Sequence, residues 1–255
     1  MKVVTWNVNS LNARADFVQR YLDAERPDVL AMQELKLPDE RVPREIFESR
    51  GYHLVIHGQK QYNGVAIASL APITASGQGL PDGDENQSRL CWADIDGVRF
   101  INLYCPQGAS ADSDKFAYKL RFYDALLAWI GRNSTPATVV LGDLNIAPEP
   151  RDIWDPVLMD GVPSFHPEEH VRWRALVGLG FEDVVRDRVP PRTFSFWDYR
   201  GVAFRNNDGM RIDHVLMTPT VAARVRGAGI ARAWRKKVDG LAASDHAPVW
   251  VEFDA

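Results

Sequence analysis

The chain has 255 residues, long enough for a substantial hydrophobic core, and its 45% apolar and 25% charged residues are typical of a globular protein. A formal net charge of −4 argues against a uniformly basic nucleic-acid binder, and two cysteines exclude a cysteine-based zinc module. Neither an apolar run approaching about 18 residues nor a signal peptide is visible, so we expect no membrane segment and a reducing, cytoplasmic setting.

In chain order, alternating or continuous apolar runs predict strands, and apolar residues at helical spacing predict helices. Strands are expected over residues 2–8, 28–34, 53–58, 64–70, 91–106 (two strands joined by an Asp-Gly turn), 138–145, 211–218 and 248–253. Helices are expected over residues 10–25, 115–132 and 170–180. This order of elements predicts one α+β domain over residues 1–255, with two packed sheets flanked by helices.

Two further features follow from the same pass along the chain. Residues 146–171 contain five prolines and little periodicity, which predicts a long ordered loop of the kind that often carries function. Cys91 and Cys105 lie in apolar strand-like stretches, so we expect buried free thiols and no disulfide.

Polar residues collect where the predicted strands end. They are Asn7, Glu34, Asp143, Asn145, Asp213, Asp245 and His246. Each of them taken singly is more often a turn former, a helix cap or a surface charge than a catalyst. Their number and kind, four carboxylates, two amides and one imidazole, favour a shared site.

This set of side chains is suited to a hard divalent cation. Oxygen ligands without cysteine, and with few histidines, indicate Mg²⁺ or Mn²⁺. A remaining acid and imidazole could then orient or deprotonate a water molecule, which is the chemistry of phosphoester hydrolysis. We expect Asp213 to lie beside His246 and to fix the tautomer of its ring.

One strongly basic segment departs from the acidic net charge. Residues 224–237 (RVRGAGIARAWRKK) carry six arginines and lysines and no acid. This segment is either a solvated basic surface or a patch that meets a phosphate backbone.

The motifs resemble those of exonuclease III-type AP endonucleases, in the endonuclease/exonuclease/phosphatase superfamily with the DNase I-like fold. The resemblance covers essentially the whole chain. The matching blocks are TWNVNSLNAR, MQELK, YNGVAI, NLYCPQG, LGDLNIAP, SFHPEE, TFSFWDYR, MRIDHVL and SDHAPVW. The resemblance implies a four-layer α/β sandwich.

The resemblance also implies a metal site and a water-activating pair. Glu34 is similar to the principal metal ligand of the family, with Asn7 and Asp245 close to the same ion. Asp143 and Asn145 resemble the pair that positions the attacking water, and they are also candidate ligands of a second ion. The implied cofactor is Mg²⁺, with Mn²⁺ as a substitute.

Further residues are implied to contact the substrate. Tyr104 resembles the phosphate-contacting tyrosine and Gln107 a DNA contact. His246 resembles the active-site histidine, with Asp213 as its orienting partner. Two assignments stay open: either Asp143 is the base and His246 a hydrogen-bond donor, or His246 is the base and Asp143 serves the leaving group.

A pocket for the damaged nucleotide is implied by TFSFWDYR. Phe196, Trp197 and Met210 are expected to form its wall, because nucleases that act on a damaged nucleotide hold it against apolar side chains. Phe194 is interpreted as core. Two departures from the family pattern are Asn12, where a basic residue is common, and His214, to which we assign no role.

The implied function is Mg²⁺-dependent repair of DNA in base excision repair. The enzyme would cut 5′ to abasic sites, leaving a 3′-hydroxyl, and would act as a 3′→5′ exonuclease and clean blocked 3′ ends. Its expected partner is double-stranded DNA with abasic sites or 3′ ends, bound by a monomer. Alternatives are a phosphatase or phosphodiesterase of the same superfamily acting on lipid or inositol phosphates, and a catalytically inactive DNA-binding module.

Overall fold

Two six-stranded sheets dominate the computed structural model, which describes residues 1–83, 86–237 and 239–254. One sheet has the order β11-β12-β1-β2-β4-β3 and the other β5-β6-β7-β8-β10-β9. The strands are β1 (Lys2–Asn7), β2 (Val29–Gln33), β3 (His53–His57), β4 (Val65–Ser69), β5 (Ile73–Gln78), β6 (Leu90–Ile95), β7 (Val98–Tyr104), β8 (Thr138–Asp143), β9 (Glu182–Asp183), β10 (Asp213–Met217), β11 (Val225–Ile230) and β12 (Val249–Phe253).

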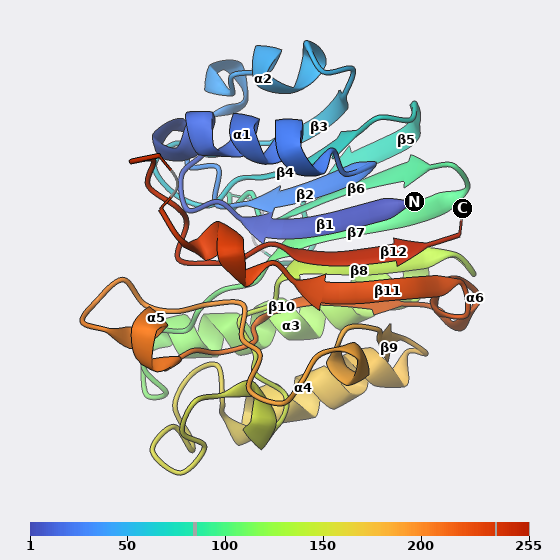
Figure 1. Cartoon of the computed structure of the whole chain (residues 1–255). Helices are drawn as coiled ribbons and strands as arrows, with labels where there is room; N and C mark the ends of the chain where they lie inside the picture. Colours follow the sequence, from blue (N-terminus) through green and yellow to red (C-terminus); the bar gives the residue numbers. More distant parts are fainter. Residues whose placement is uncertain (84–85, 238, 255) are drawn as a thin grey trace.

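Both sheets are mixed. The pairs β1–β2 and β7–β8 are parallel, and the other pairs are antiparallel. The N- and C-termini lie side by side at one end of the first sheet, where the Met1 amino group donates to the Phe253 carbonyl (Figure 1).

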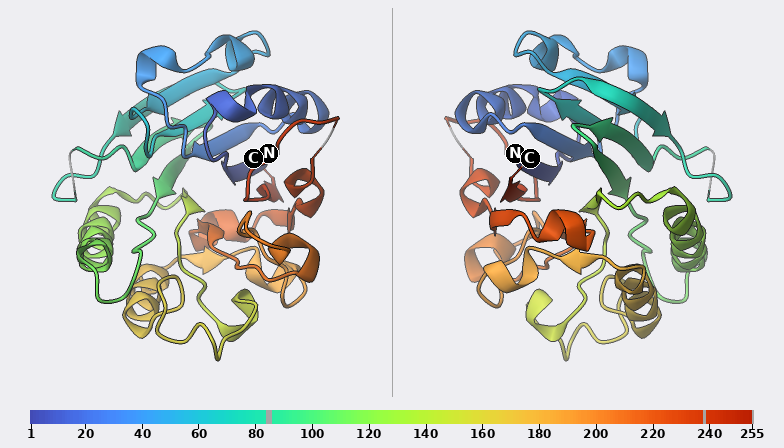
Figure 2. Two further views of the ribbon diagram at one scale, coloured as in Figure 1. Left: turned by 90° about the vertical axis from the view of Figure 1, so that its left-hand side faces the viewer. Right: turned by 90° about the vertical axis from the view of Figure 1, so that its right-hand side faces the viewer.

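The described helices are α1 (Ala15–Glu25), α2 (Glu45–Glu48), α3 (Asp114–Asn133), α4 (Pro167–Gly178), α5 (Ala203–Asn206) and α6 (Pro219–Ala222). The first four cover the outer faces of the two sheets (Figure 2). Figure 2 shows α1 and α2 outside the first sheet and α3 and α4 outside the second. The predicted four-layer α+β sandwich is therefore confirmed. Within the described residues, no helix combines the length and the apolar character needed to cross a membrane.

The alternation of side chains along a strand explains the layers. Val3 of β1 packs into the core between the sheets, while Val4 and Trp6 point the other way, into the core beneath α1. Trp6 there contacts Tyr21 of α1, with ring centroids 5.0 Å apart. Because successive residues of a strand face opposite sides, one short run of apolar residues supplies two cores.

The strands and helices expected from periodicity are present, with ends shifted by a few residues. The long loop was predicted too far along the chain, because α4 already begins at Pro167. The expected state of the cysteines is confirmed, since Cys91 and Cys105 are buried free thiols. Three strands were not predicted, β5, β9 and β11, and all three are edge strands of their sheets.

Candidate active site

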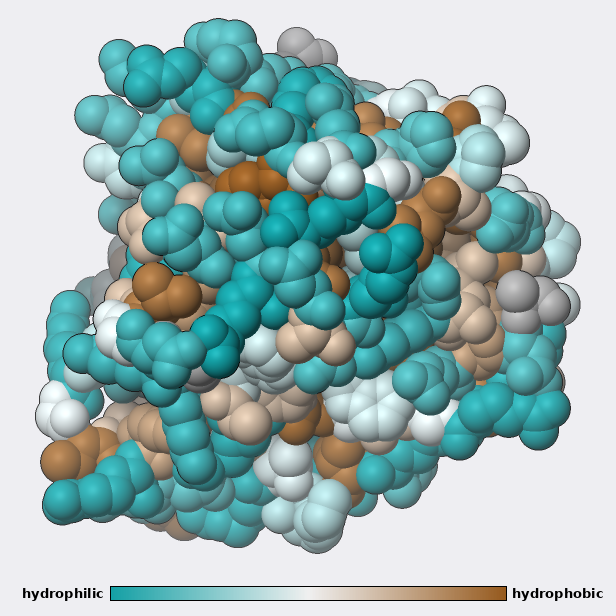
Figure 3. Space-filling view, turned by 45° about the horizontal axis from the view of Figure 1, so that its top comes forward, coloured by the Kyte–Doolittle hydropathy of each residue, from teal (hydrophilic) through white to brown (hydrophobic). Residues whose placement is uncertain are grey.

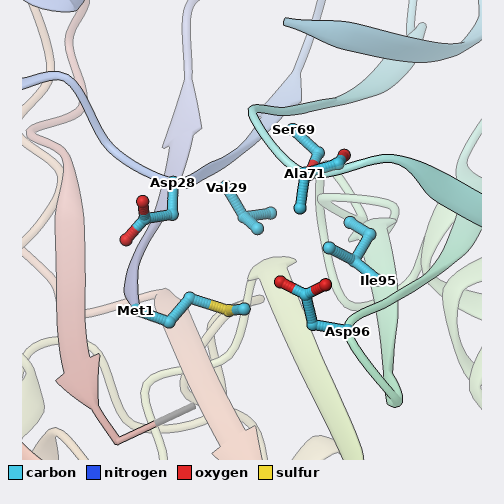
Figure 4. Close-up of a pocket in the computed structure, with 7 residues that line it drawn as sticks. All are labelled: Met1, Asp28, Val29, Ser69, Ala71, Ile95 and Asp96. Atoms are coloured by element: carbon cyan, nitrogen blue, oxygen red, sulfur yellow. The ribbon is translucent and has the colours of Figure 1, made fainter.

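A small cleft opens where the central strands end. Its cavity measures about 140 Å³ and is lined by Glu34, Tyr104, Gln107, Asp143, Asn145, Ser164, Phe196, Met210, Ile212, Asp245 and His246. A different pocket, shown in Figure 4, lies at the opposite ends of the same strands, between Met1 at the start of β1 and Val29 at the start of β2. The predicted site residues therefore gather at one end of the sandwich.

Strand register explains why residues so distant in sequence meet. In the first sheet Asn7 pairs with Gln33 in parallel register, so Glu34 emerges beside Asn7. In the second sheet Asp143 lies between Tyr104 on one side and Asp213 on the other. The two sheets meet here, because the Asn7 amide donates to Glu34 Oε1 at 2.7 Å and to Asp143 Oδ2 at 2.9 Å.

Glu34 is held as an anion in this largely buried position. Burial alone would raise its pKa, but the charge of Lys36 and hydrogen bonds from Asn7 and Lys36 keep the pKa below the ordinary value. Lys36 Nζ lies 2.8 Å from Glu34 Oε2. Both carboxylate oxygens therefore have a partner that stabilises their charge.

A buried acid–imidazole–acid row crosses the floor of the cleft. Asp213 Oδ2 lies 2.8 Å from His246 Nδ1, and His246 Nε2 lies 3.8 Å from Asp143 Oδ2. Burial, the largest single effect, lowers the pKa of His246, but the charge and hydrogen bond of Asp213 together with the charges of Asp143 and Asp245 outweigh it and raise the pKa to about 10. Burial, together with the charge of Asp213, raises the pKa of Asp143 to about 7. In this arrangement the imidazole is a proton donor near neutral pH, and Asp143 is poised to exchange a proton.

Tyr104 presents a neutral hydroxyl to the same cleft. Burial and the charges of Glu34 and Asp143 raise the pKa of Tyr104 well above its ordinary value. The guanidinium carbon of Arg89 lies over the Tyr104 ring, 4.9 Å from its centre. Tyr104 therefore remains a hydrogen-bond donor at any physiological pH.

The end of β8 and the loop after it, which carry Asp143 and Asn145, are tightly constrained. Gly142 has a φ of 143°, and an added Cβ would collide with the carbonyl oxygen of Leu103, so only glycine fits. Asn145 has a φ of 52°, and its amide donates to the Cys105 carbonyl at 2.9 Å. Strained backbone of this kind concentrates at functional sites, where surrounding contacts hold it in place.

A buried ion pair supports this loop from below. Lys119 of α3 and Glu169 of α4 are fully buried and paired with each other. Lys119 Nζ also donates to the Asn145 carbonyl at 2.7 Å and to the Gln107 carbonyl at 3.1 Å. Glu169 accepts from the amide of Ser164, another residue of the cleft, at 3.0 Å. The pair thus fixes three cleft residues through their backbones.

The apolar wall of the cleft contains two of the three predicted residues. Phe196 forms backbone bridges with Met210 and with His246, and its ring centroid lies 4.8 Å from that of His246. Trp197 is placed differently from the prediction: it is fully buried, packs against Phe204 and lies outside the cleft lining. Successive residues point to opposite sides, so Phe196 reaches the cleft and Trp197 the core.

The donor atoms can accommodate a divalent cation. One atom each of Glu34, Asp143 and His246 lies within 4.8 Å of the others. The carboxylate oxygens of Glu34 and Asp143 are the ligands suited to a hard cation, and His246 stands beside them as a hydrogen-bond donor. Asp245 lines the cleft, but its Oδ1 accepts from Asn9 Nδ2 at 3.0 Å. This group contains Glu34 and Asp143 and does not contain Asp245. Asp213 Oδ1 is buried without a hydrogen-bond partner among the described residues, while its Oδ2 pairs with His246.

Several residues of the site were not predicted. Lys36 carries a weak signal, because it stands two residues after Glu34 in MQELK. Lys119 and Glu169 carry none, since a charged residue in a helix usually faces solvent. His214, to which no role was assigned, lies outside the cleft: its Nδ1 is 2.9 Å from Arg211 Nη1, and its Nε2 is 2.8 Å from the Ile146 carbonyl oxygen.

Comparisons with known proteins agree with this architecture. The model of the Endonuclease/Exonuclease/phosphatase family matches residues 4–246. Exodeoxyribonuclease III of Haemophilus influenzae is 36% identical over 275 aligned positions, covering 99% of this chain and 100% of the relative. A 3′ phosphatase from Neisseria, solved with a product DNA hairpin, is 39% identical with a TM-score of 0.94, and an AP endonuclease from Archaeoglobus fulgidus is 34% identical with a TM-score of 0.93; each alignment covers 100% of both chains.

The two packed sheets and the site at their strand ends place the protein in the DNase I-like fold class. The chain belongs to the endonuclease/exonuclease/phosphatase family. Its predicted resemblance to exonuclease III-type AP endonucleases is confirmed by full-length relatives of that kind.

Proposed function

We propose that this protein is a Mg²⁺-dependent repair nuclease that cuts DNA 5′ to abasic sites, degrades duplex from 3′ ends and removes blocking groups there. The observation that carries the proposal is the convergence of Glu34, Asp143 and His246, whose donor atoms lie within 4.8 Å of one another at the floor of a cleft. The relatives support it, since they include an exodeoxyribonuclease III, an AP endonuclease and a 3′ phosphatase.

In the proposed reaction, water attacks the phosphorus, the bond to the upstream 3′ oxygen breaks, and that oxygen takes a proton from solvent water to leave as the 3′-hydroxyl. Asp143 accepts the proton of the water, and Asn145 holds the water in line with the leaving oxygen. His246 and Tyr104 donate hydrogen bonds to non-bridging oxygens, whose negative charge grows in the transition state. The raised pKa of His246 favours this assignment over the one in which the imidazole is the base.

A bound Mg²⁺ would neutralise charge on the phosphoryl and leaving oxygens. Glu34 is the principal ligand in this proposal, with Asn7 and Asp245 close to the ion and Asp143 and Asn145 available to a second one. Mn²⁺ would serve as a substitute, because the donors are mainly oxygens.

Selection of the abasic nucleotide is assigned to the apolar wall. Phe196 and Met210 face the cleft and would contact a sugar that carries no base. Gln107 is exposed at the rim and would contact the flanking DNA.

A substrate panel tests this proposal. The assay compares an abasic duplex, an intact duplex, a duplex ending in a 3′-phosphate, an inositol phosphate and sphingomyelin, each with Mg²⁺ and with EDTA. We expect cleavage of the DNA substrates only, with Mg²⁺ only, and a product one nucleotide shorter than the position of the abasic site. Hydrolysis of the lipid or inositol phosphate in place of DNA would establish the rival phosphatase function, and binding without any cleavage would establish the binding module.

We further propose that residues 1–255 act as one domain, as a monomer and in the cytoplasm. The shared cleft supports the first point, because both sheets contribute to it. Light scattering of the purified protein, alone and with duplex, measures the oligomeric state, and a dimer mass would contradict the proposal.

A further inference from the structure

A second, basic pocket lies next to the active-site cleft. It measures about 360 Å³ and is lined by Arg14, Tyr199, Phe204, Arg235, Lys236, Lys237, Ala242 and Ala243. Four of these residues are cations, and no acid is among them in the part of the chain that the structure describes. In a protein with a net charge of −4, such a concentration of positive charge calls for an anionic ligand.

The basic pocket shares a wall with the catalytic site. Arg235 Nε donates to the Asp245 carbonyl at 3.1 Å, and the Asp245 side chain lines the cleft. On the other side, Arg14 donates to the Asn9 carbonyl, and Asn9 Nδ2 donates to Asp245 Oδ1 at 3.0 Å. An extended polyanion that reaches the cleft can therefore continue into the basic pocket.

The four cations of the pocket fall into two groups. Arg14 is held by the Asn9 carbonyl and by Tyr199 Oη, to which it donates at 2.9 Å. Arg235 is buried and fixed: it donates to the Trp197 carbonyl at 3.1 Å, and its guanidinium lies 4.8 Å from the ring centre of Tyr199. Lys236 and Lys237 are exposed and form no ion pair with any described residue. The lysines are the charges that remain available to a ligand, and Arg235 holds their segment in place.

Another pocket of the protein, also rich in arginine, shows that arginines alone do not leave positive charge available to a ligand. It contains Arg151, Arg186, Arg188 and Arg211, but Glu149 and Asp187 line it as well and pair with Arg151. Its charges are balanced within the protein. The face seen in Figure 3 is also largely hydrophilic, with apolar residues in separate patches, so that face offers no broad apolar docking surface.

We propose that the basic pocket is a phosphodiester-binding subsite, in which Lys236 and Lys237 hold a backbone phosphate of the DNA outside the damaged nucleotide. The proposal rests on the proposed nuclease function and assigns a role to the end of the basic segment 224–237. Other basic residues of that segment contact groups within the protein. Arg226, for example, pairs with Asp254 near the C-terminus.

The test is the salt dependence of DNA binding. A double variant, Lys236→Gln/Lys237→Gln, is compared with a control of equal net charge, Arg44→Gln/Arg226→Gln, whose exposed arginines pair with acids elsewhere. Dissociation constants for an abasic duplex are measured in EDTA between about 50 and 200 mM salt. Each lost phosphate contact should lower the slope of log Kd against log salt by about 0.9, so we expect a drop of about 1 to 2 for the lysine variant and none for the control.

A scan with single methylphosphonates then locates the phosphate. Wild type should lose affinity at one or two adjacent positions outside the abasic nucleotide, and the lysine variant should lose nothing further there. Equal slopes in the two variants, or no position that couples to the lysines, would overturn the subsite even if wild type cleaves DNA normally. If the slope changes as expected while wild type leaves abasic DNA uncut, the proposed function fails and the subsite stands.

Discussion

The row formed by Asp213, His246 and Asp143 leads to a quantitative prediction. Replacing Asp213 with asparagine keeps the shape of the side chain and removes its charge, 2.8 Å from His246 Nδ1. A hydrogen bond to a charged group contributes about 1.5–3 kcal/mol, which corresponds to about 10- to 150-fold in rate if it is needed in the transition state. We therefore expect kcat for cleavage of an abasic duplex to fall by that factor near neutral pH.

The same variant changes the protonation of the ring. Without the charge of Asp213, burial acts to lower the pKa of His246 from about 10 toward the ordinary value of 6.5. Histidine resonances of the metal-free protein, followed by NMR against pH, measure this shift directly. The control is Asp187→Asn, which removes a carboxylate whose side chain is 84% exposed. A wild-type kcat together with an unmoved His246 titration in the Asp213 variant would refute the reasoning.

Three other substitutions test the supports of the site. Lys119→Met should lower the free energy of unfolding by about 3–5 kcal/mol, because it leaves Glu169 charged and unpaired, and Lys119→Met/Glu169→Gln should recover part of that loss in urea denaturation. Gly142→Ala should cost about 3 kcal/mol or more, measured in the same way, since the new Cβ meets the Leu103 carbonyl; an unchanged midpoint would contradict the close approach. Phe196→Ala should reduce the preference for abasic over intact duplex by about tenfold or more, seen as a ratio of kcat/KM values, and an unchanged ratio would remove Phe196 from the pocket wall.

Much of the fold could be predicted because its central elements carry local signals. Strand β1 is a short run rich in apolar and β-branched residues that is buried on both faces, and helix α3 repeats apolar residues at helical spacing. Edge strands carry weaker signals. In β11 the glycines at 227 and 229 leave room for the ring of Trp250, so this strand lacks the β-branched pattern that marks the others. In β5 most residues are exposed, and no apolar alternation is needed.

The chemistry of the site could be predicted for a similar reason. Asn7, Glu34 and Asp143 follow strands whose ends a sheet brings together, so residue type and position already indicate a shared cleft. The buried residues that hold the cleft in place could not be predicted in this way. The buried pair of Lys119 and Glu169 depends on how α3 packs against α4, and the sequence of either helix alone contains no sign of it.

The most direct test of the central claim is the initial rate of abasic-duplex cleavage as a function of Mg²⁺ concentration, for wild type and Glu34→Gln. We predict that wild type is inactive in EDTA and that its cleavage rate saturates with increasing Mg²⁺. The variant should bind the duplex but cleave it at about one hundredth of the wild-type rate or lower. Cleavage that persists in EDTA, or a variant that matches wild type, would contradict a metal-dependent site built around Glu34.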